Sequence, residues 1–236
     1  MIDGAREIGR AIEAGVRVLE VFACPPMCQR DVAQSVLDRL AQTAAEVLEV
    51  TEVVFRKMAF GDRAEGVLAV AEMPRPHLSC LVLDEPPLVA VLEGVEKPGN
   101  LGAVIRSADG AGLSALVVAE PRTDLYNPNV IRASLGTVFT LPVCVAASDE
   151  TLRWLRSRGL AVFAARVGGA MPYSDADFRQ PCALVLGSEA TGLSPLWTGP
   201  GVTEIRLPMF GKADSLNVSA AAAVLFYEAV RQRGVR

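Results

Sequence analysis

The segment Pro208–Ala223 carries residues whose types and spacing suit the binding of a polar ligand. It follows an alternating stretch expected to form a strand over residues 203–207, and it enters a small-residue helix predicted over Val218–Val230. The turn-forming and helix-capping residues between them are Gly211, Asp214, Ser215 and Asn217. A strand that leads through a polar loop into a helix N-terminus presents backbone N–H groups and side-chain oxygens together. An ordinary strand–turn–helix connection would contain the same residues.

A second segment, Lys97–Gly112, also leads from a strand into a helix. Its glycines, Gly99 and Gly102, read G-x-x-G rather than G-x-G-x-x-G, which argues against a dinucleotide-binding oxidoreductase. Asn100 stands where a helix cap is expected, and Arg106 follows within the helix among apolar neighbours. We therefore expect Arg106 to be half-buried and to have an anionic partner, either a carboxylate or a phosphate.

A third segment, Leu184–Ser194, is an apolar strand that ends at Gly187. The polar loop after it is closed by Gly192 and contains Ser188, Glu189 and Thr191. The bare backbone at Gly187 would let a flat ligand lie against it. Alternatively, the segment is a strand–loop–helix joint in which Glu189 is a capping carboxylate.

These segments belong to a predicted α/β domain. Apolar strands alternate with helices, and runs such as ALVVA and CALVL are apolar on both faces, as a parallel sheet covered by helices requires. Strands are expected over residues 80–83, 88–92, 115–119, 142–145, 160–165, 182–186 and 204–207. Residues 1–73 read as a smaller α/β unit, and the prolines of residues 74–79 indicate a linker before the domain at 80–236.

The composition restricts the classes of function. The chain has 236 residues, 51% of them hydrophobic, without a membrane-length apolar run or a signal-peptide pattern, so a cytoplasmic protein is expected. Five cysteines and one histidine lack zinc-ligand spacing, so no metal is expected. The net charge is −4, and acidic residues outnumber basic ones in residues 1–79, which is unfavourable for binding RNA. The basic cluster in that part, an RNA contact or a solvated surface, is Arg56, Lys57 and Arg63.

Taken together, the segments NLGAVIRSADGAG, LVLGSEATGLS and LPMFGKADSLNVSAAAAVLFYE resemble, in order and spacing, the three motifs of the SpoU/TrmH family (SPOUT superfamily) of RNA ribose 2′-O-methyltransferases. Asn127-Pro128, Arg132-Ala133-Ser134 and Leu141-Pro142 look like the NP…RAS…LP segment of that family. The resemblance covers residues 80–233. Residues 1–73 resemble the L30e-like RNA-binding domain that many members carry, beginning within it, so the usual basic leader is expected to be missing.

The resemblance implies a trefoil-knotted α/β fold that binds S-adenosylmethionine in a bent shape. The positions that would line this cofactor site are Leu186, Gly187, Leu207, Met209, Ser215 and Leu216. Family members dimerise through the knot region, and the second subunit helps to build each site. A homodimer is therefore expected.

The resemblance also implies a catalytic set, in which Arg106 engages the target ribose. The residues expected around it are Asn100, Glu189, Ser215 and Asn217. Arg106 would act either as the base that removes the 2′-hydroxyl proton or as a clamp on phosphate and developing alkoxide, and the sequence leaves both open. RNA contacts are expected from Arg56, Lys57, Arg63 and Arg106.

The implied function is S-adenosylmethionine-dependent 2′-O-methylation of RNA. Ribosomal RNA of the large subunit (23S) is favoured over transfer RNA, because the tRNA-specific relatives generally lack the L30e-like domain. The alternatives are a tRNA ribose methyltransferase and a non-catalytic RNA-binding or ribosome-assembly factor. The modified nucleotide is not predicted, nor is the choice between a housekeeping and an antibiotic-resistance role.

Overall fold

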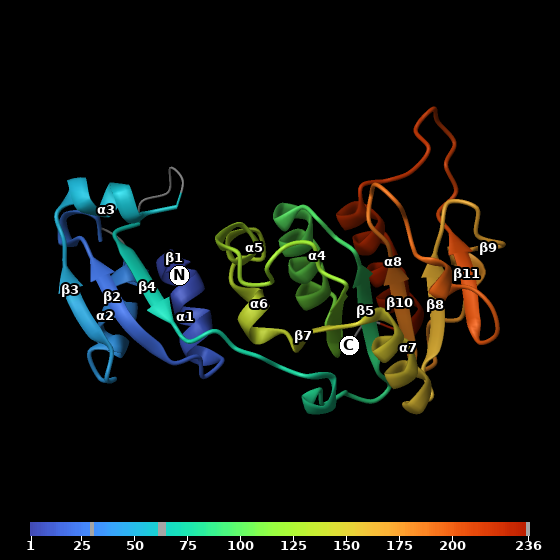
Figure 1. The fold of residues 1–236 in the computed structure, drawn as a ribbon, viewed down its shortest axis with the longest axis horizontal. Helices are drawn as coiled ribbons and strands as arrows, with labels where there is room; N and C mark the ends of the chain where they lie inside the picture. Colours follow the sequence, from blue (N-terminus) through green and yellow to red (C-terminus); the bar gives the residue numbers. More distant parts are fainter. Residues whose placement is uncertain (29–30, 61–64, 235–236) are drawn as a thin grey trace.

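The computed structural model describes residues 1–28, 31–60 and 65–234, which form two α/β units (Figure 1). The elements of the first unit are β1 (Ile2–Asp3), α1 (Ala5–Glu13), β2 (Val18–Ala23), a 3-10 turn (Pro25–Met27), α2 (Asp31–Leu40), β3 (Glu46–Glu49), α3 (Glu52–Met58) and β4 (Val67–Ala71). Their sheet has the order β1-β4-β2-β3. Helices α1 and α2 pack on one face of it, and Phe55 of α3 packs on the other face against Leu68.

The second unit is built on a seven-stranded sheet with the order β7-β6-β5-β10-β8-β11-β9, in which every pair is parallel. Its strands are β5 (Leu88–Glu93), β6 (Ala115–Ala119), β7 (Val143–Ala146), β8 (Ala161–Ala165), β9 (Met171–Pro172), β10 (Cys182–Leu186) and β11 (Val202–Arg206). Its helices are α4 (Pro98–Gly110), α5 (Pro128–Ala133), α6 (Thr137–Thr140), α7 (Ser148–Ser157) and α8 (Val218–Arg233). The predicted α/β fold with a parallel sheet is confirmed.

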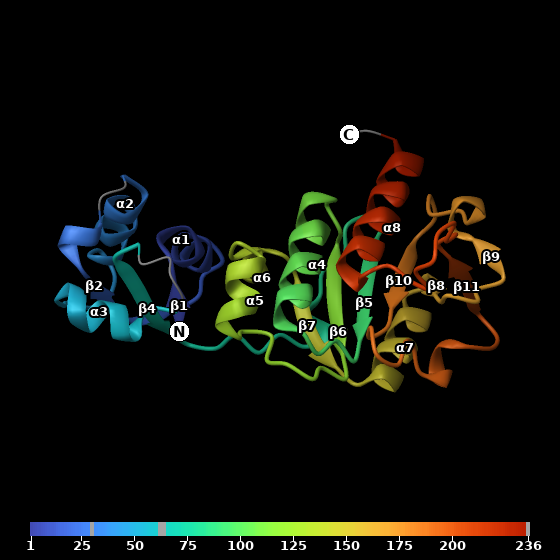
Figure 2. The same cartoon turned by 90° about the horizontal axis from the view of Figure 1, so that it is seen from above.

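Helices cover both faces of this sheet, which explains why its central strands are apolar throughout. Alternate residues such as Leu92 and Leu184 face α4 and α8, while their neighbours Val91 and Val185 face α7 and the buried Trp197. Figure 2 shows α4 and α8 side by side over the middle of the sheet. All five residues of β10 are buried, as the sequence predicts for a covered parallel strand.

Helices α4 and α5 approach so closely that only glycine fits at the contact. A Cβ on Gly102 would lie 2.6 Å from the Cβ of Ala133 and 2.7 Å from the carbonyl oxygen of Val130. The second glycine of the G-x-x-G pattern is therefore required for helix packing rather than for a ligand.

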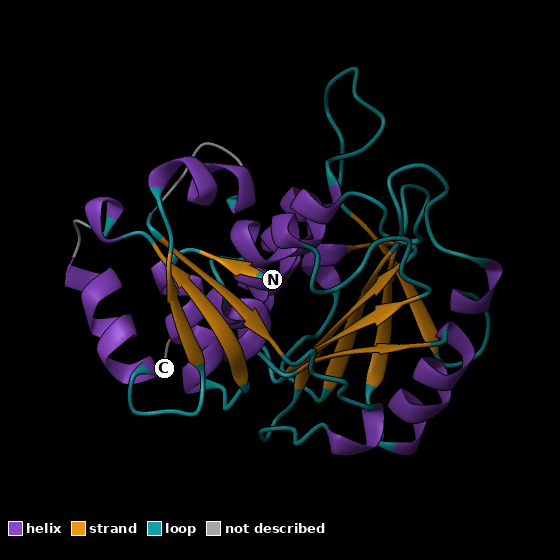
Figure 3. Ribbon diagram, turned by 60° about the vertical axis from the view of Figure 1, so that its left-hand side comes forward, coloured by secondary structure: helices purple, strands orange, loops and turns teal. Residues whose placement is uncertain are grey.

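The two units contact each other through α1 and the corner between α5 and α6 (Figure 3). Arg10 Nη1 donates to the carbonyl oxygen of Leu135 at 2.7 Å, and Arg132 Nη1 donates to that of Phe60 at 2.9 Å. Gly136, with φ at 83°, turns the chain where a Cβ would lie 3.0 Å from Glu7 Cα. The arginine of the RAS segment thus joins the two units.

Two sequence expectations differ from the structure. The strand predicted at residues 80–83 is wrong: a 3-10 turn (Leu78–Cys80) precedes a segment without regular structure. Leu78 and Leu81 pack on one face of the sheet, so the apolar residues that suggested a strand cover it instead of pairing within it. The helix cap expected at Asn100 is also wrong: α4 begins at Pro98, so Lys97 is the cap residue and Asn100 lies in the first turn.

No helix in the described residues is long and apolar enough to cross a membrane. Within the same residues, no group of three or more His, Cys, Asp or Glu side chains is placed to hold a metal ion.

Candidate functional site

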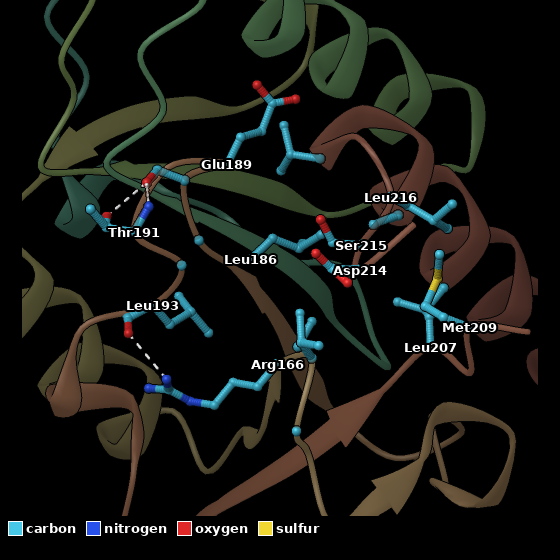
Figure 4. Close-up of a pocket in the computed structure, with 18 of the residues that line it drawn as sticks. Arg166, Leu186, Glu189, Thr191, Leu193, Leu207, Met209, Asp214, Ser215 and Leu216 are labelled. Atoms are coloured by element: carbon cyan, nitrogen blue, oxygen red, sulfur yellow. Dashed lines mark hydrogen bonds between the residues drawn. The ribbon is translucent and has the colours of Figure 1, made fainter. Parts of the chain in front are cut away.

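A cavity of about 420 Å³ lies where β8, β10 and β11 end and α8 begins (Figure 4). The carboxyl ends of parallel strands meet at one edge of a sheet, which is the usual place for a ligand in open α/β folds. The six positions expected to bind the cofactor, namely Leu186, Gly187, Leu207, Met209, Ser215 and Leu216, all line this cavity. Two segments far apart in sequence, after β10 and after β11, therefore share one pocket.

The loop after β10 forms a tight wall of the cavity. A Cβ on Gly187 would lie 2.3 Å from the carbonyl carbon of Gly192 and 2.4 Å from the backbone nitrogen of Leu193. Ser188 Oγ accepts from the Thr191 backbone N–H at 3.1 Å, and its carbonyl oxygen accepts from the Gly192 N–H at 2.9 Å. The backbone of Gly192 and Leu193 therefore packs against Gly187 on the side where another residue would carry its Cβ.

Three predicted catalytic residues meet next to this cavity. Asn100 Nδ2 donates to Glu189 Oε1 at 3.0 Å, and Asn217 Nδ2 donates to the same carboxylate oxygen and to Asn100 Oδ1, the latter at 3.3 Å. Lys97 Nζ lies 3.2 Å from Glu189 Oε2. The side chain of Glu189 is 29% exposed, so the cluster is accessible from solvent.

Asn217 also caps α8. Its Oδ1 accepts from the backbone N–H of Ser219 at 3.0 Å and from the Ser219 hydroxyl at 2.6 Å. The amide oxygen of Asn217 therefore accepts hydrogen bonds at the start of α8, while its NH₂ group donates to Glu189. A second cavity, of about 240 Å³, lies over the cluster and shares Ser188, Glu189 and Val218 with the first.

Arg106 lies apart from this cluster. The expectation that it is half-buried is wrong, because the covered stripe of α4 is formed by Leu101, Val104, Ile105 and Ala108, and Arg106 is exposed beside it. Among the described residues it has no hydrogen bond or ion pair, and it lines neither cavity. Arg106 is the sixth residue after Asn100, which places the two side chains about 120° apart around the helix. The partner expected for this guanidinium is therefore not supplied by the described part of its own chain.

The remaining expected residues that the structure describes are exposed. Ser215 lines the first cavity from the loop before α8. Arg56 forms an ion pair with Glu52 at 2.7 Å on α3, and Lys57 is exposed beside it without an ion pair among the described residues. Arg63 lies outside the described residues.

Two charged residues that line the cavity, Arg166 and Glu204, were not predicted from the sequence. Arg166, directly after β8, donates from Nη1 to Leu193 O at 3.1 Å and from Nη2 to Ser194 O at 2.7 Å. Its Nε lies 3.8 Å from Glu204 Oε1, and both side chains line the cavity. Both residues lie at or near the ends of predicted strands, and this position could have indicated that they line a ligand site.

Glu93, the last residue of β5, was also missed, and it accepts four hydrogen bonds. Oε1 accepts from the Ser148 hydroxyl at 2.6 Å, from the Ser194 hydroxyl at 2.9 Å and from Trp197 Nε1 at 2.8 Å. Oε2 accepts from the Ser194 backbone N–H at 2.7 Å. Burial raises the pKa of this carboxyl, but the four hydrogen bonds outweigh burial and hold the pKa below its ordinary value.

The fold is that of an α/β protein with a cavity at the carboxyl edge of a parallel sheet. Residues 87–227 match the model of the SpoU rRNA Methylase family, and residues 1–69 match the MRM3-like substrate binding domain. The chain belongs to the SpoU methylase family. This confirms the resemblance inferred from the three motifs.

The relatives that match over most of the chain bear names of ribosomal RNA enzymes. The chain is 34% identical, over 99% of its length and 83% of the relative, to 23S rRNA (uridine(2479)-2′-O)-methyltransferase of Streptomyces viridochromogenes. It is 39% identical to 23S rRNA (guanosine-2′-O-)-methyltransferase RlmB of Ralstonia nicotianae, over 76% of this chain and 74% of the relative.

Solved structures match one or both units of the chain. The SpoU methyltransferase AviRb from Streptomyces viridochromogenes, in complex with the cofactor AdoMet, matches with a TM-score of 0.87 and 32% identity over 98% of this chain and 89% of that one. A structure described for 2-OH methylation of C/U34 on tRNA matches with a TM-score of 0.56 and 31% identity, over 97% of its own length and 62% of this chain.

Proposed function

We propose that this protein transfers a methyl group from S-adenosylmethionine to a ribose 2′-hydroxyl of 23S ribosomal RNA. The proposal rests on one observation: Asn100, Glu189 and Asn217, from three segments far apart in the sequence, are hydrogen-bonded to one another beside the cavity. The relative from Streptomyces viridochromogenes named for 23S rRNA matches over 99% of this chain and so spans both units, whereas the tRNA-related structure matches over 62%. The first unit is therefore the feature that favours ribosomal RNA over transfer RNA.

The cavity suits the proposed cofactor chemically. Leu186, Leu207 and Leu216 provide apolar walls for an aromatic base, and backbone groups at the strand ends provide hydrogen bonds to its edge. Polar and charged side chains, including Asp214 and Glu204, line the same cavity and suit hydroxyl and amino groups. When bound, S-adenosylmethionine supplies the sulfonium methyl group that the ribose oxygen takes.

The protein's own groups would position the acceptor. The 2′-oxygen would bond to the methyl carbon as its bond to sulfur breaks, S-adenosylhomocysteine would be the leaving group, and the hydroxyl proton would pass to solvent. Asn100, Glu189 and Asn217 form a fixed polar cluster beside the cavity, and such a preorganised cluster can hold a ribose in line with the methyl group. In the proposed role the guanidinium group of Arg106 stabilises the developing alkoxide and the adjacent phosphate by charge and hydrogen bonding.

We propose that Arg106 acts in the site of a second subunit. Arg106 lies one helical turn before Gly110, and a Cβ on Gly110 would lie 3.3 Å from the Tyr227 hydroxyl. Tyr227 is 54% exposed and Val224, one turn earlier on α8, is 38% exposed. Phe210, 98% exposed, lies in the loop before α8. Arg106 therefore borders an apolar surface that a partner subunit would cover.

The dimer is tested by placing a charge on that surface. We expect Val224→Glu to convert the dimer to monomer, with an increase of roughly a hundredfold or more in the dimer dissociation constant, because an unpaired buried charge costs several kcal/mol. Light scattering coupled to size exclusion measures the mass across a dilution series. Val32→Glu, on a valine of α2 that is 53% exposed, is the matched control and should stay dimeric. A monomeric wild-type protein would refute the dimer proposal.

The same proposal covers the remaining expectations from the family. Residues 1–73 would bind RNA as an L30e-like domain joined through 74–79 to the catalytic domain at 80–236, with Arg56, Lys57 and Arg63 as contacts. The chain after β11 would thread through a loop to form the trefoil knot. An enzyme of ribosomal RNA works where ribosomes assemble, so the protein would be cytoplasmic.

The experiment for the function is transfer of labelled methyl from S-adenosylmethionine to purified RNA. We expect label in 23S ribosomal RNA, supplied as free RNA or as large subunits, and none in transfer RNA. Because a 2′-O-methyl group protects the adjacent phosphodiester, the label should appear in alkali-resistant dinucleotides. Label confined to transfer RNA would favour the alternative substrate, and cofactor binding without label in any fraction would favour a non-catalytic RNA-binding protein.

A further inference from the structure

Glu93 and Arg166 hold one peptide group of the cavity wall from opposite sides. The backbone N–H of Ser194 donates to Glu93 Oε2 at 2.7 Å, and the carbonyl oxygen of Leu193, in the same peptide group, accepts from Arg166 Nη1 at 3.1 Å. Leu193, the preceding residue, lines the cavity. The end of the wall is therefore fixed by a carboxylate from β5 and a guanidinium from the residue after β8.

Glu93 itself lines neither cavity. It is 6% exposed, and its other bonds reach Ser148, the first residue of α7, and the fully buried Trp197. The donors come from positions 55 and more than 100 residues away in the sequence. A buried carboxylate requires such donors, since burying an unpaired charge is costly.

We infer that Glu93 is a positioning residue for S-adenosylmethionine, which acts by holding the loop of residues 188–194 against the cavity. The inference rests on the proposed function. Gly187 and Gly192 are in van der Waals contact, so a shift at Ser194 is transmitted to the strand end at Gly187. The loop also carries Glu189, but its own bonds to Asn100 and Asn217 hold that side chain independently. Loss of the Glu93 carboxylate should therefore weaken cofactor binding more than the chemical step.

Glu93→Gln tests this because it keeps the shape and changes one acceptor into a donor. Four donors point at the two carboxylate oxygens, and hydroxyl groups can rotate to accept instead. In one amide orientation the NH₂ group meets the Ser194 backbone N–H, and in the other it meets Trp197 Nε1–H. Neither orientation satisfies every donor.

In the full-length chain we expect Glu93→Gln to raise the calorimetric dissociation constant for S-adenosylmethionine about tenfold. At saturating cofactor, kcat and the KM for RNA should stay within about twofold of the wild type, a split that general destabilisation would not produce. Ser148→Ala is the matched control: it removes one bond to the same carboxylate from α7, which lines neither of the two cavities described above, and should leave the cofactor affinity unchanged.

The outcomes separate this inference from the proposed function. Equal affinities for the wild type and Glu93→Gln would overturn the inference alone, as would an equal loss in Ser148→Ala. If the wild type does not bind S-adenosylmethionine, the proposed function fails and the inference with it. If Glu93→Gln does not fold, Ser194→Ala is the deciding variant, because it loses only a hydroxyl bond to Glu93. Weaker binding of S-adenosylmethionine by Ser194→Ala than by Ser148→Ala supports the inference. Equal binding by the two variants overturns it.

Discussion

Replacing Arg106 with alanine is expected to lower the rate of methyl transfer by a hundredfold to a thousandfold, on the order seen when a preorganised charge-stabilising donor is removed. Arg106 is exposed and has no hydrogen bond or ion pair among the described residues, so the folded protein does not depend on it. The free energy of unfolding should change by less than about 0.5 kcal/mol. The dissociation constant for S-adenosylmethionine should also be unchanged, since Arg106 does not line the cavity.

Single-turnover methyl transfer, calorimetry with the cofactor and thermal unfolding measure these three quantities. Arg153→Ala is the matched control: Arg153 is also an exposed helical arginine, but it lies on α7 on the other face of the sheet and should retain full activity. Mixing Arg106→Ala with a variant disabled at Glu189 tests the dimer directly, because mixed dimers would regain one complete site. An active Arg106→Ala protein would contradict the proposed role.

Replacing Gly187 with alanine is expected to abolish measurable cofactor binding and to destabilise the protein by about 1–3 kcal/mol, the usual cost of overpacking a rigid site. The added Cβ would lie 2.3 Å from the carbonyl carbon of Gly192 and 2.4 Å from the Leu193 nitrogen, which are backbone atoms that no rotamer change can move. Relief requires a displacement of the loop that forms the cavity wall. The cavity should therefore lose its shape even where the protein still folds.

Gly99→Ala is the control for this substitution. A Cβ on Gly99 meets nothing within 4 Å, and the residue lies in the first turn of α4, where alanine is favoured over glycine. It should keep cofactor affinity and show equal or greater stability by chemical denaturation. Normal cofactor binding by Gly187→Ala would show that the wall of the cavity can adjust, and would contradict this account of the glycine.

Local patterns in the sequence predicted the parallel sheet, because strands apolar on both faces require helices to cover them. The resemblance to the SpoU/TrmH family supplied the cavity-lining residues, including Gly187 and Leu207. The cap at Asn217 follows from the turn chemistry next to a helical pattern. These features depend on neighbours in sequence or on the geometry of a single element.

The environments of Arg106 and Glu93 were decided by packing between elements. The apolar neighbours of Arg106 in the sequence predicted that it is half-buried, but the helices packed against α4 cover only its apolar stripe and leave Arg106 exposed. Glu93 reads as the polar end of an apolar strand, and nothing near it in sequence indicates its donors at Ser148, Ser194 and Trp197. The sequence by itself determined the family, the parallel sheet and the lining of the cavity. Only the tertiary structure decided which charged groups are buried and which are free, because the desolvation and hydrogen bonding of a charge depend on residues far away along the chain.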